Sequence, residues 1–215
     1  MGSKANGSAN KPMTLTQEQL ISRWLQFRDA FVRQLERTST DELRSAWTRP
    51  SRRTKLYTRE VLPAIATDLE LRPTTELFKV DAALRIPAPN GELVPIVFIE
   101  SENVATTAGH EMRKLCAVSC PVAVLVTVVE WNPAVFGQKA WADRLQNEWQ
   151  RIMKAHYEVW PRPGIIGIIV GEWGDDWWLR FYSLAYLTDG SVCVPQSEDF
   201  SRLIQSLPSQ PSINV

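Results

Sequence analysis

The first third of the chain carries its hydrophobic residues at helical spacing. Between residues 14 and 38 they recur every three or four positions, as Leu20, Trp24, Phe27, Phe31 and Leu35. This period predicts one amphipathic helix over 14–38, which Thr16 can cap. Further helices are predicted over 40–47, capped by Thr40 or Asp41, over 54–69, with a kink at Pro63, over 106–118 and over 134–159.

From residue 76 onward the pattern changes to short apolar runs that are typical of β-strands. Strands are predicted over 76–86, 93–100, 121–130, 164–171 and 177–187. The valine-rich run at 121–130 indicates a strand with apolar cover on both faces. Helices and strands therefore alternate, which predicts the α/β class, with a mixed central β-sheet flanked by helices and extra helices at the N-terminus.

Composition narrows the class of protein without changing this picture. The chain has 215 residues, of which 44% are hydrophobic and 22% charged, as in an ordinary globular protein. One domain is expected over 14–205, between a disordered segment at 1–13 and a flexible tail at 206–215. The formal net charge is zero, so any contact with nucleic acid has to use a local basic patch.

Cysteine usage and hydropathy bear on the compartment. Three cysteines are too few, and an odd number, for a disulfide framework, which suits a reducing environment. The N-terminus has no apolar stretch, and the apolar runs near 121–130 and 164–171 are too short to span a bilayer. We therefore expect a cytoplasmic protein with no membrane partner.

A hairpin in the middle of the chain aligns two acidic residues. Asn-Gly is a strong signal for a two-residue hairpin turn, and Asn90 and Gly91 separate two predicted strands. If they are the central turn residues, Asp81 faces Glu100 across the strand pair. Facing residues have Cβ atoms ~5 Å apart, so the two carboxylates repel unless a positive charge lies between them.

The surroundings of Glu100 strengthen this expectation. Glu100 ends the apolar run Val97-Phe98-Ile99, where a carboxylate is costly to desolvate unless it is paired or bound to a metal. Strand alternation places Glu102 on the same face as Glu100. The hairpin therefore gathers acidic side chains at one end of an apolar sheet.

At these residues the sequence resembles the PD-(D/E)XK nuclease superfamily. The matching pieces are Val80-Asp81 and Ile99-Glu100-Ser101-Glu102, and Glu60 corresponds to an acid that this family often carries on the preceding helix. The resemblance covers roughly residues 54–130. It departs from the family at Glu102, where a lysine is usual, and Lys114 on the following helix is well placed as a migrated lysine.

The resemblance implies a metal-dependent hydrolase of DNA or RNA. Asp81, Glu100 and the backbone carbonyl of Ser101 would hold Mg²⁺ or Mn²⁺. Lys114 would contact the phosphate or position the water, and Glu102 would act as a general base or help to hold a second metal. Many nucleases of this fold are dimers, and the tryptophan-rich surfaces permit a homodimer.

A basic run supplies a candidate nucleic-acid surface. Residues 44–59 contain no acidic residue, and the side chains expected to grip a phosphate backbone are Arg49, Arg52, Arg53, Lys55 and Arg59. The run directly precedes Glu60, which favours a shared surface.

Two other classes of function stay open at this stage. One is an inactive nuclease-fold protein that binds nucleic acid or another protein, in which a lysine or arginine merely neutralises Asp81 and Glu100. The other is a protein that binds a nucleotide or small molecule in the same acidic pocket. The position of Lys114 relative to Asp81 and Glu100 separates the nuclease from the inactive protein.

Overall fold

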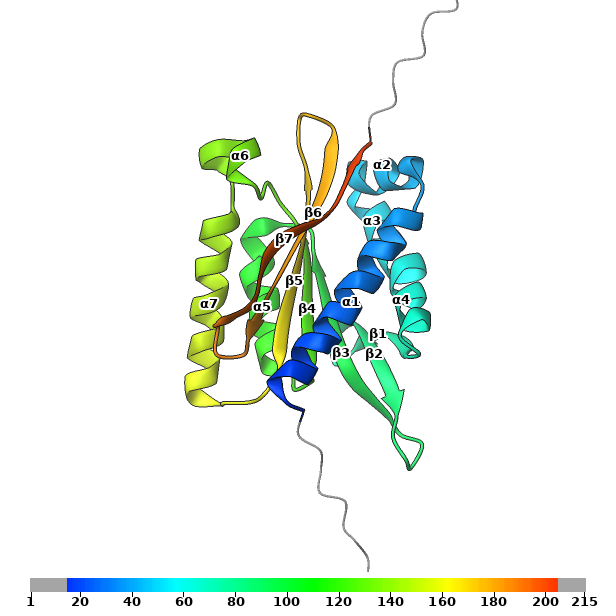
Figure 1. Ribbon diagram of the computed structural model, residues 1–215, viewed down its shortest axis with the longest axis vertical. Helices are drawn as coiled ribbons and strands as arrows, with labels where there is room; N and C mark the ends of the chain where they lie inside the picture. The colour runs from blue at the N-terminus through cyan, green and yellow to red at the C-terminus, as the bar shows by residue number, and fades with distance from the viewer. Residues whose placement is uncertain (1–14, 205–215) are drawn as a thin grey trace, which may run out of the picture.

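The computed structural model describes residues 15–204 and shows one β-sheet between two layers of helices (Figure 1). The expected disordered segment at 1–13 and tail at 206–215 lie outside the described residues. The strands of the sheet are β1 (Arg72–Leu77), β2 (Val80–Pro87), β3 (Leu93–Glu102), β4 (Val122–Val128), β5 (Ile165–Trp173), β6 (Trp178–Leu187) and β7 (Val192–Leu203). The predicted α/β class with a mixed sheet is confirmed.

The sheet changes from antiparallel to parallel and back along its width. Its seven strands lie in sequence order. Strands β1 to β3 are antiparallel, β3 to β5 are parallel, and β5 to β7 are again antiparallel. Because β3, β4 and β5 run the same way, their carboxyl ends meet at one edge of the sheet.

The two layers of helices cover opposite faces of the sheet. The helices are α1 (Gln17–Arg37), α2 (Thr40–Thr48), α3 (Pro50–Leu56), η1 (Tyr57–Val61), α4 (Leu62–Asp68), η2 (Ala105–Thr107), α5 (Ala108–Ala117), α6 (Pro133–Phe136), η3 (Gly137–Lys139) and α7 (Ala142–Val159). Helices α1 to α4 bury their apolar faces in one core cluster, and α5 and α7 in the other. None of the helices in the described part is long and apolar enough to cross a membrane.

Local capping explains where the first helices begin. Thr16 caps α1 as predicted, and it forms a capping box with Gln19. The cap of α2 is Ser39, one residue before the predicted Thr40, because its side chain accepts the N–H of Glu42. A proline at the first helical position starts α3 at Pro50, earlier than predicted.

Pro63 does not end the third helical segment. It lacks an N–H donor and its ring would clash with the preceding turn. The chain relieves this clash through a π-helical turn, η1, in which the N–H of Leu62 donates to the carbonyl of Tyr57. Residues 50–68 therefore continue as helix past the proline.

Three sequence predictions miss a break or an element. The predicted strand at 76–86 is divided by a turn at Phe78 and Lys79, which have φ angles of 54° and 64°. The predicted helix at 134–159 is divided near Gly137, whose φ is 58°. Strand β7 escaped prediction because its segment is polar and contains Pro195.

The β2–β3 hairpin reaches its predicted register by a different route. The connecting loop has three residues, since the N–H of Ala88 donates to Glu92, and Gly91 adopts a φ of 86°. A bulge between Leu84 and Arg85 then shifts the pairing by one residue. The two deviations cancel, so Ala82 pairs with Ile99, the partner that the predicted register requires.

The close approach of α1 to the sheet depends on Gly167. A Cβ atom added at Gly167 would overlap the ring of Trp24, which is fully buried. We predict that Gly167→Ala lowers the free energy of unfolding by ~3 kcal/mol, because the packed core cannot absorb the overlap. Urea denaturation would measure the loss.

Two further variants make this prediction specific. In Gly167→Ala combined with Trp24→Leu, the loss should be smaller than the sum of the single losses, since the smaller side chain makes room. Gly109→Ala is the control, because its Cβ would meet only the flexible ends of the Glu148 and Arg113 side chains. Equal losses at the two glycines, or strict additivity with Trp24→Leu, would contradict this account.

Candidate active site

Asp81 and Glu100 lie level with each other at the carboxyl edge of the central strands. The pairing of Ala82 with Ile99 places Asp81, one residue earlier on β2, opposite Glu100 on β3. The backbone N–H of Ser101 donates to Asp81 Oδ2 over 2.8 Å, which holds this carboxylate against the end of β3. Asp81 is exposed, whereas only 1% of Glu100 is exposed.

Helix α5 brings Lys114 to Glu100. The helix packs against the sheet through Met112, Leu115 and Cys116. Lys114 Nζ lies 2.6 Å from Glu100 Oε1 and 2.7 Å from Glu111 Oε2, one turn earlier on the helix. The lysine that the sequence placed on this helix therefore reaches Glu100.

The protonation of this cluster reflects its burial. Burial raises the pKa of Glu100 to about 8; its contact with Lys114 opposes this shift, and the charges of Asp81 and Glu111 add to it. Partial burial disfavours the charged form of Lys114, but its contacts with Glu100 and Glu111 outweigh this effect and raise its pKa. A further positive charge nearby would therefore stabilise the charged form of Glu100.

The two carboxylates of Asp81 and Glu100 suit a cation whose other ligands are water or substrate oxygens. Within residues 15–204, no group of three or more histidine, cysteine, aspartate or glutamate side chains could by itself hold a metal ion. Mg²⁺ commonly uses only one or two carboxylates and completes its shell with water and phosphate oxygens. The two carboxylates Asp81 and Glu100 offer oxygen ligands of the kind that Mg²⁺ or Mn²⁺ would use, and the carbonyl of Ser101 stays a predicted third ligand.

The other two predicted acids have contacts or surroundings of their own. Glu102 Oε1 accepts the N–H of Val104 over 2.8 Å and so caps the turn that follows β3. Glu60 is exposed on η1 and lines a cavity with Glu42 and Arg59. Glu60 and Asp81 line different cavities, so no shared pocket links them.

Four of the five predicted nucleic-acid contacts are available at the surface. Arg49, Arg52, Lys55 and Arg59 are exposed. Three of them, Arg52, Lys55 and Arg59, share a cavity wall with Glu60, as the sequence suggested. This wall is not the one that Asp81 borders, so the basic residues and the acidic pair do not form one pocket.

Arg53 needs correction as a nucleic-acid contact, because it is only 5% exposed. Its Nε donates to Asn103 Oδ1 over 2.7 Å, and its guanidinium lies over the ring of Trp47. Burial lowers its pKa, although the nearby Tyr57 opposes this shift. Arg53 therefore ties α3 to the segment after β3 and so fixes the helical layer beside the candidate site.

A cavity of about 440 Å³ opens beside Asp81, between the sheet and the layer of α1, α3, η1 and α4. Phe31, Tyr57, Leu62, Ile99 and Val126 contribute apolar walls, and Asp81 and Ser101 belong to its lining. No sequence pattern indicated this cavity, because its walls come from segments that are far apart in the chain.

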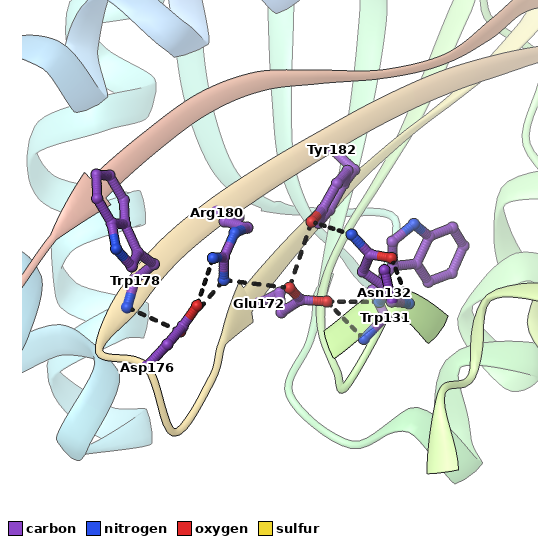
Figure 2. Close-up of polar contacts among 8 residues, drawn as sticks. Trp131, Asn132, Glu172, Asp176, Trp178, Arg180 and Tyr182 are labelled. Carbon is purple, nitrogen blue, oxygen red and sulfur yellow. Dashed lines mark hydrogen bonds and ion pairs between the residues drawn. The ribbon is translucent and has the colours of Figure 1, made fainter. Parts of the chain in front are cut away.

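A second buried carboxylate lies at the same edge of the sheet, on β5 (Figure 2). Glu172 Oε2 accepts the backbone N–H groups of Trp131, over 3.0 Å, and Asn132, over 2.5 Å. The hydroxyl of Tyr182 donates to its other oxygen, and Arg180 lies 3.8 Å from that oxygen. Burial raises the pKa of Glu172, while these donors oppose the shift.

The two buried carboxylates differ in how far the chain itself satisfies them. Glu172 is held by backbone donors, so it anchors the start of α6 and leaves little capacity for a ligand. Glu100 has no backbone donor, and Lys114 is its one ion-pair partner among the described residues. Of the two, Glu100 is the carboxylate that can accept a ligand.

Glu111 is a site residue that the sequence analysis passed over. It contacts the ammonium group of Lys114 in addition to Glu100 and so helps to hold this group in place. Its spacing of three residues from Lys114 on a helix is a recognisable signal for an ion pair.

Comparisons with known proteins identify no family. No protein-family model matches the chain, and no curated protein matches its sequence. The functional argument therefore depends on the geometry of the site.

The raised pKa of Glu100 predicts a pH dependence of stability. Burial raises the pKa of Glu100 to about 8 in the folded protein, above its ordinary value of 4.5 in the unfolded chain. Between these values the folded state binds more protons, so its stability must fall as pH rises, by at most ~1.4 kcal/mol per pH unit. Below pH 4.5 the stabilising contribution of protonated Glu100 is fully present.

Denaturant unfolding of metal-free protein between pH 5 and pH 8 would test this. Glu100→Gln should flatten the fall in stability, because an amide does not titrate. Glu158→Gln, at an exposed position on α7, is the matched control and should leave the profile unchanged. A Glu100→Gln profile parallel to that of the wild type would refute the assignment.

Proposed function

We propose that this protein is a divalent-metal-dependent nuclease that hydrolyses phosphodiester bonds of DNA or RNA. The observation that carries the proposal is the contact of Lys114 with Glu100, 2.6 Å apart, beside Asp81 at the edge of the sheet. Two acids and a lysine supply what phosphodiester hydrolysis needs: a place for a cation and a positive group for the phosphate.

The order of elements around the site also supports the proposal. A helical segment precedes β1, Asp81 lies on β2, Glu100 lies near the end of β3, and α5 with Lys114 follows. The PD-(D/E)XK resemblance implies this arrangement of a preceding helix, two acid-bearing strands and a following helix. The migrated lysine accounts for Glu102 at the position where that family usually has lysine.

Each residue then has a defined task. Asp81, Glu100 and the carbonyl of Ser101 would hold Mg²⁺ or Mn²⁺, which supplies positive charge to the phosphate and polarises a water molecule. Lys114 contacts a phosphate oxygen and stabilises the charge that develops on it. Glu111 orients Lys114 and keeps it protonated. The proposal assigns no role to Glu60 or Glu102.

Cleavage of labelled single- and double-stranded DNA and RNA with Mg²⁺ or Mn²⁺ tests the proposal directly. Asp81→Asn, Glu100→Gln and Lys114→Met should each lower kcat by ~100-fold or more, as expected when a group that acts in the transition state is removed. Lys154→Met, at an exposed position on α7, should retain wild-type activity.

Thermal unfolding adds a readout that does not depend on activity. Mg²⁺ should raise the Tm of the wild type but not that of Glu100→Gln, because binding to the folded state stabilises it. Cleavage that survives in all three site variants would point to a contaminant or another site. Absence of cleavage on every substrate, together with an unchanged Tm, would reject the nuclease.

The exposed basic residues on α3 predict how nucleic acid is held. Removing two phosphate contacts in Arg52→Ala with Lys55→Ala should reduce the slope of log affinity against log salt by ~1.4 to 1.8. The matched control is Arg151→Ala with Lys154→Ala on α7, which should leave the slope unchanged. Fluorescence anisotropy with a labelled oligonucleotide would measure the slope for each protein. If the Arg52→Ala with Lys55→Ala variant has the same slope as the wild type, this surface does not bind the phosphate backbone.

A second candidate is a catalytically inactive protein of the same fold that binds nucleic acid or protein. It is favoured by the position of Lys114 between Glu100 and Glu111, since this ammonium group can neutralise the buried acid without a metal. In that case Lys114→Met should destabilise the protein, and Mg²⁺ should leave the Tm unchanged.

A further inference from the structure

The cavity beside Asp81 has mainly apolar walls with a few polar residues among them. Phe31, Tyr57 and Leu62 form a wall from the helical layer, and Ile99 and Val126 form the wall from the sheet. Its volume of about 440 Å³ falls in the range of ~300–1,000 Å³ that is usual for small-molecule sites. An aromatic and aliphatic interior of this kind favours a flat ring over a flexible or strongly hydrated ligand.

The charges of the lining determine which part of a ligand can enter. In the described part of the chain, the charged residues that line the cavity are the acids Glu76 and Asp81, and no lysine or arginine is among them. A phosphate group would be repelled from such a cavity. A nucleotide could therefore insert only its base, while its phosphate stays outside the cavity, where the metal ion proposed at Asp81 would offset the repulsion.

The hydrogen-bonding groups of the lining narrow the choice of base. Thr58 donates its hydroxyl hydrogen to Thr54 O over 2.8 Å, and Thr54 donates its own to Pro50 O over 3.2 Å. Both hydroxyls therefore offer lone pairs, as do the carboxylates of Glu76 and Asp81. Acceptors of this kind match the exocyclic amino groups of cytosine, adenine and guanine, which donate hydrogen bonds.

We infer that this cavity binds one unstacked nucleobase that carries an exocyclic amino group. The inference rests on the proposed nuclease function, since it assumes that the attached phosphate lies at the edge of the sheet beside Asp81. A base can enter only if it has left the stack, so the substrate is a single strand or a strand with an extruded nucleotide. The inference thus adds a substrate class to the proposed activity.

Nucleosides without phosphate, in metal-free buffer, test the cavity alone. Ligand-observed NMR with cytidine, uridine and ribose would compare the wild type with Thr58→Phe, whose ring should fill the cavity. Thr67→Phe is the matched control, because Thr67 also donates its hydroxyl to a helix carbonyl but lies outside the cavity. Thr75→Trp blocks the same cavity from the exposed face of β1 and serves if Thr58→Phe does not fold.

We expect cytidine to bind the wild type and Thr67→Phe equally and the blocked variants at least tenfold more weakly. Uridine should bind the wild type more weakly than cytidine, and ribose should show no saturable binding. Equal affinity for cytidine and uridine, binding of ribose alone, or unchanged binding in a blocked variant would overturn the inference. The titration uses neither metal nor polynucleotide, so its failure is distinguishable from failure of the cleavage assay.

Discussion

The architecture depends on the burial of both faces of three parallel strands. Every residue of β5 from Ile165 to Glu172 is buried, as is β4 from Val122 to Thr127. Such strands need a layer of helices on each side, and the close approach of Trp24 to Gly167 shows how tightly one layer fits. The antiparallel strands at each edge extend this sheet without replacing its buried centre.

This burial also gives Glu100 its chemical character. The residue ends an apolar strand and faces α5, so its carboxylate is removed from water before any ligand is present. The cost of that desolvation appears as a pKa raised to about 8, and Lys114 offsets only part of it. A buried acid of this kind, next to the exposed carboxylate of Asp81, favours a cation or a proton at the edge of the sheet.

Glu172 shows that burial alone does not make a site. It lies at the same edge and is equally buried, yet backbone N–H groups from Trp131 and Asn132 satisfy it (Figure 2). Its role is to fix the chain between β4 and α6. The two acids differ in their donors: the backbone N–H groups at Glu172 are fixed in place, whereas the ammonium group of Lys114 is at the end of a side chain that can change its conformation.

Local patterns were enough to predict the class of fold, the helix cap at Thr16, the buried valine strand and the level positions of Asp81 and Glu100. These features follow from the period of apolar residues and from pairing near a turn, which are properties of short segments. The hairpin prediction succeeded although its turn was wrong, because the bulge at Leu84 and Arg85 compensated for the longer loop. The predicted position of Asp81 opposite Glu100 was therefore correct for a reason that the sequence did not reveal.

Tertiary structure alone decided which long-range neighbours meet. It brought Lys114 to Glu100, turned Arg53 inward to Asn103, placed Glu60 beside a different cavity from Asp81 and built the cavity from α1, the α3–α4 segment and the sheet. Strand β7 likewise depends on its pairing with β6. The amino-acid sequence by itself determined the elements and the acids on one hairpin, since local periodicity encodes them. The packing of distant segments decided what surrounds those acids, because such contacts depend on how the helical layers fit the sheet.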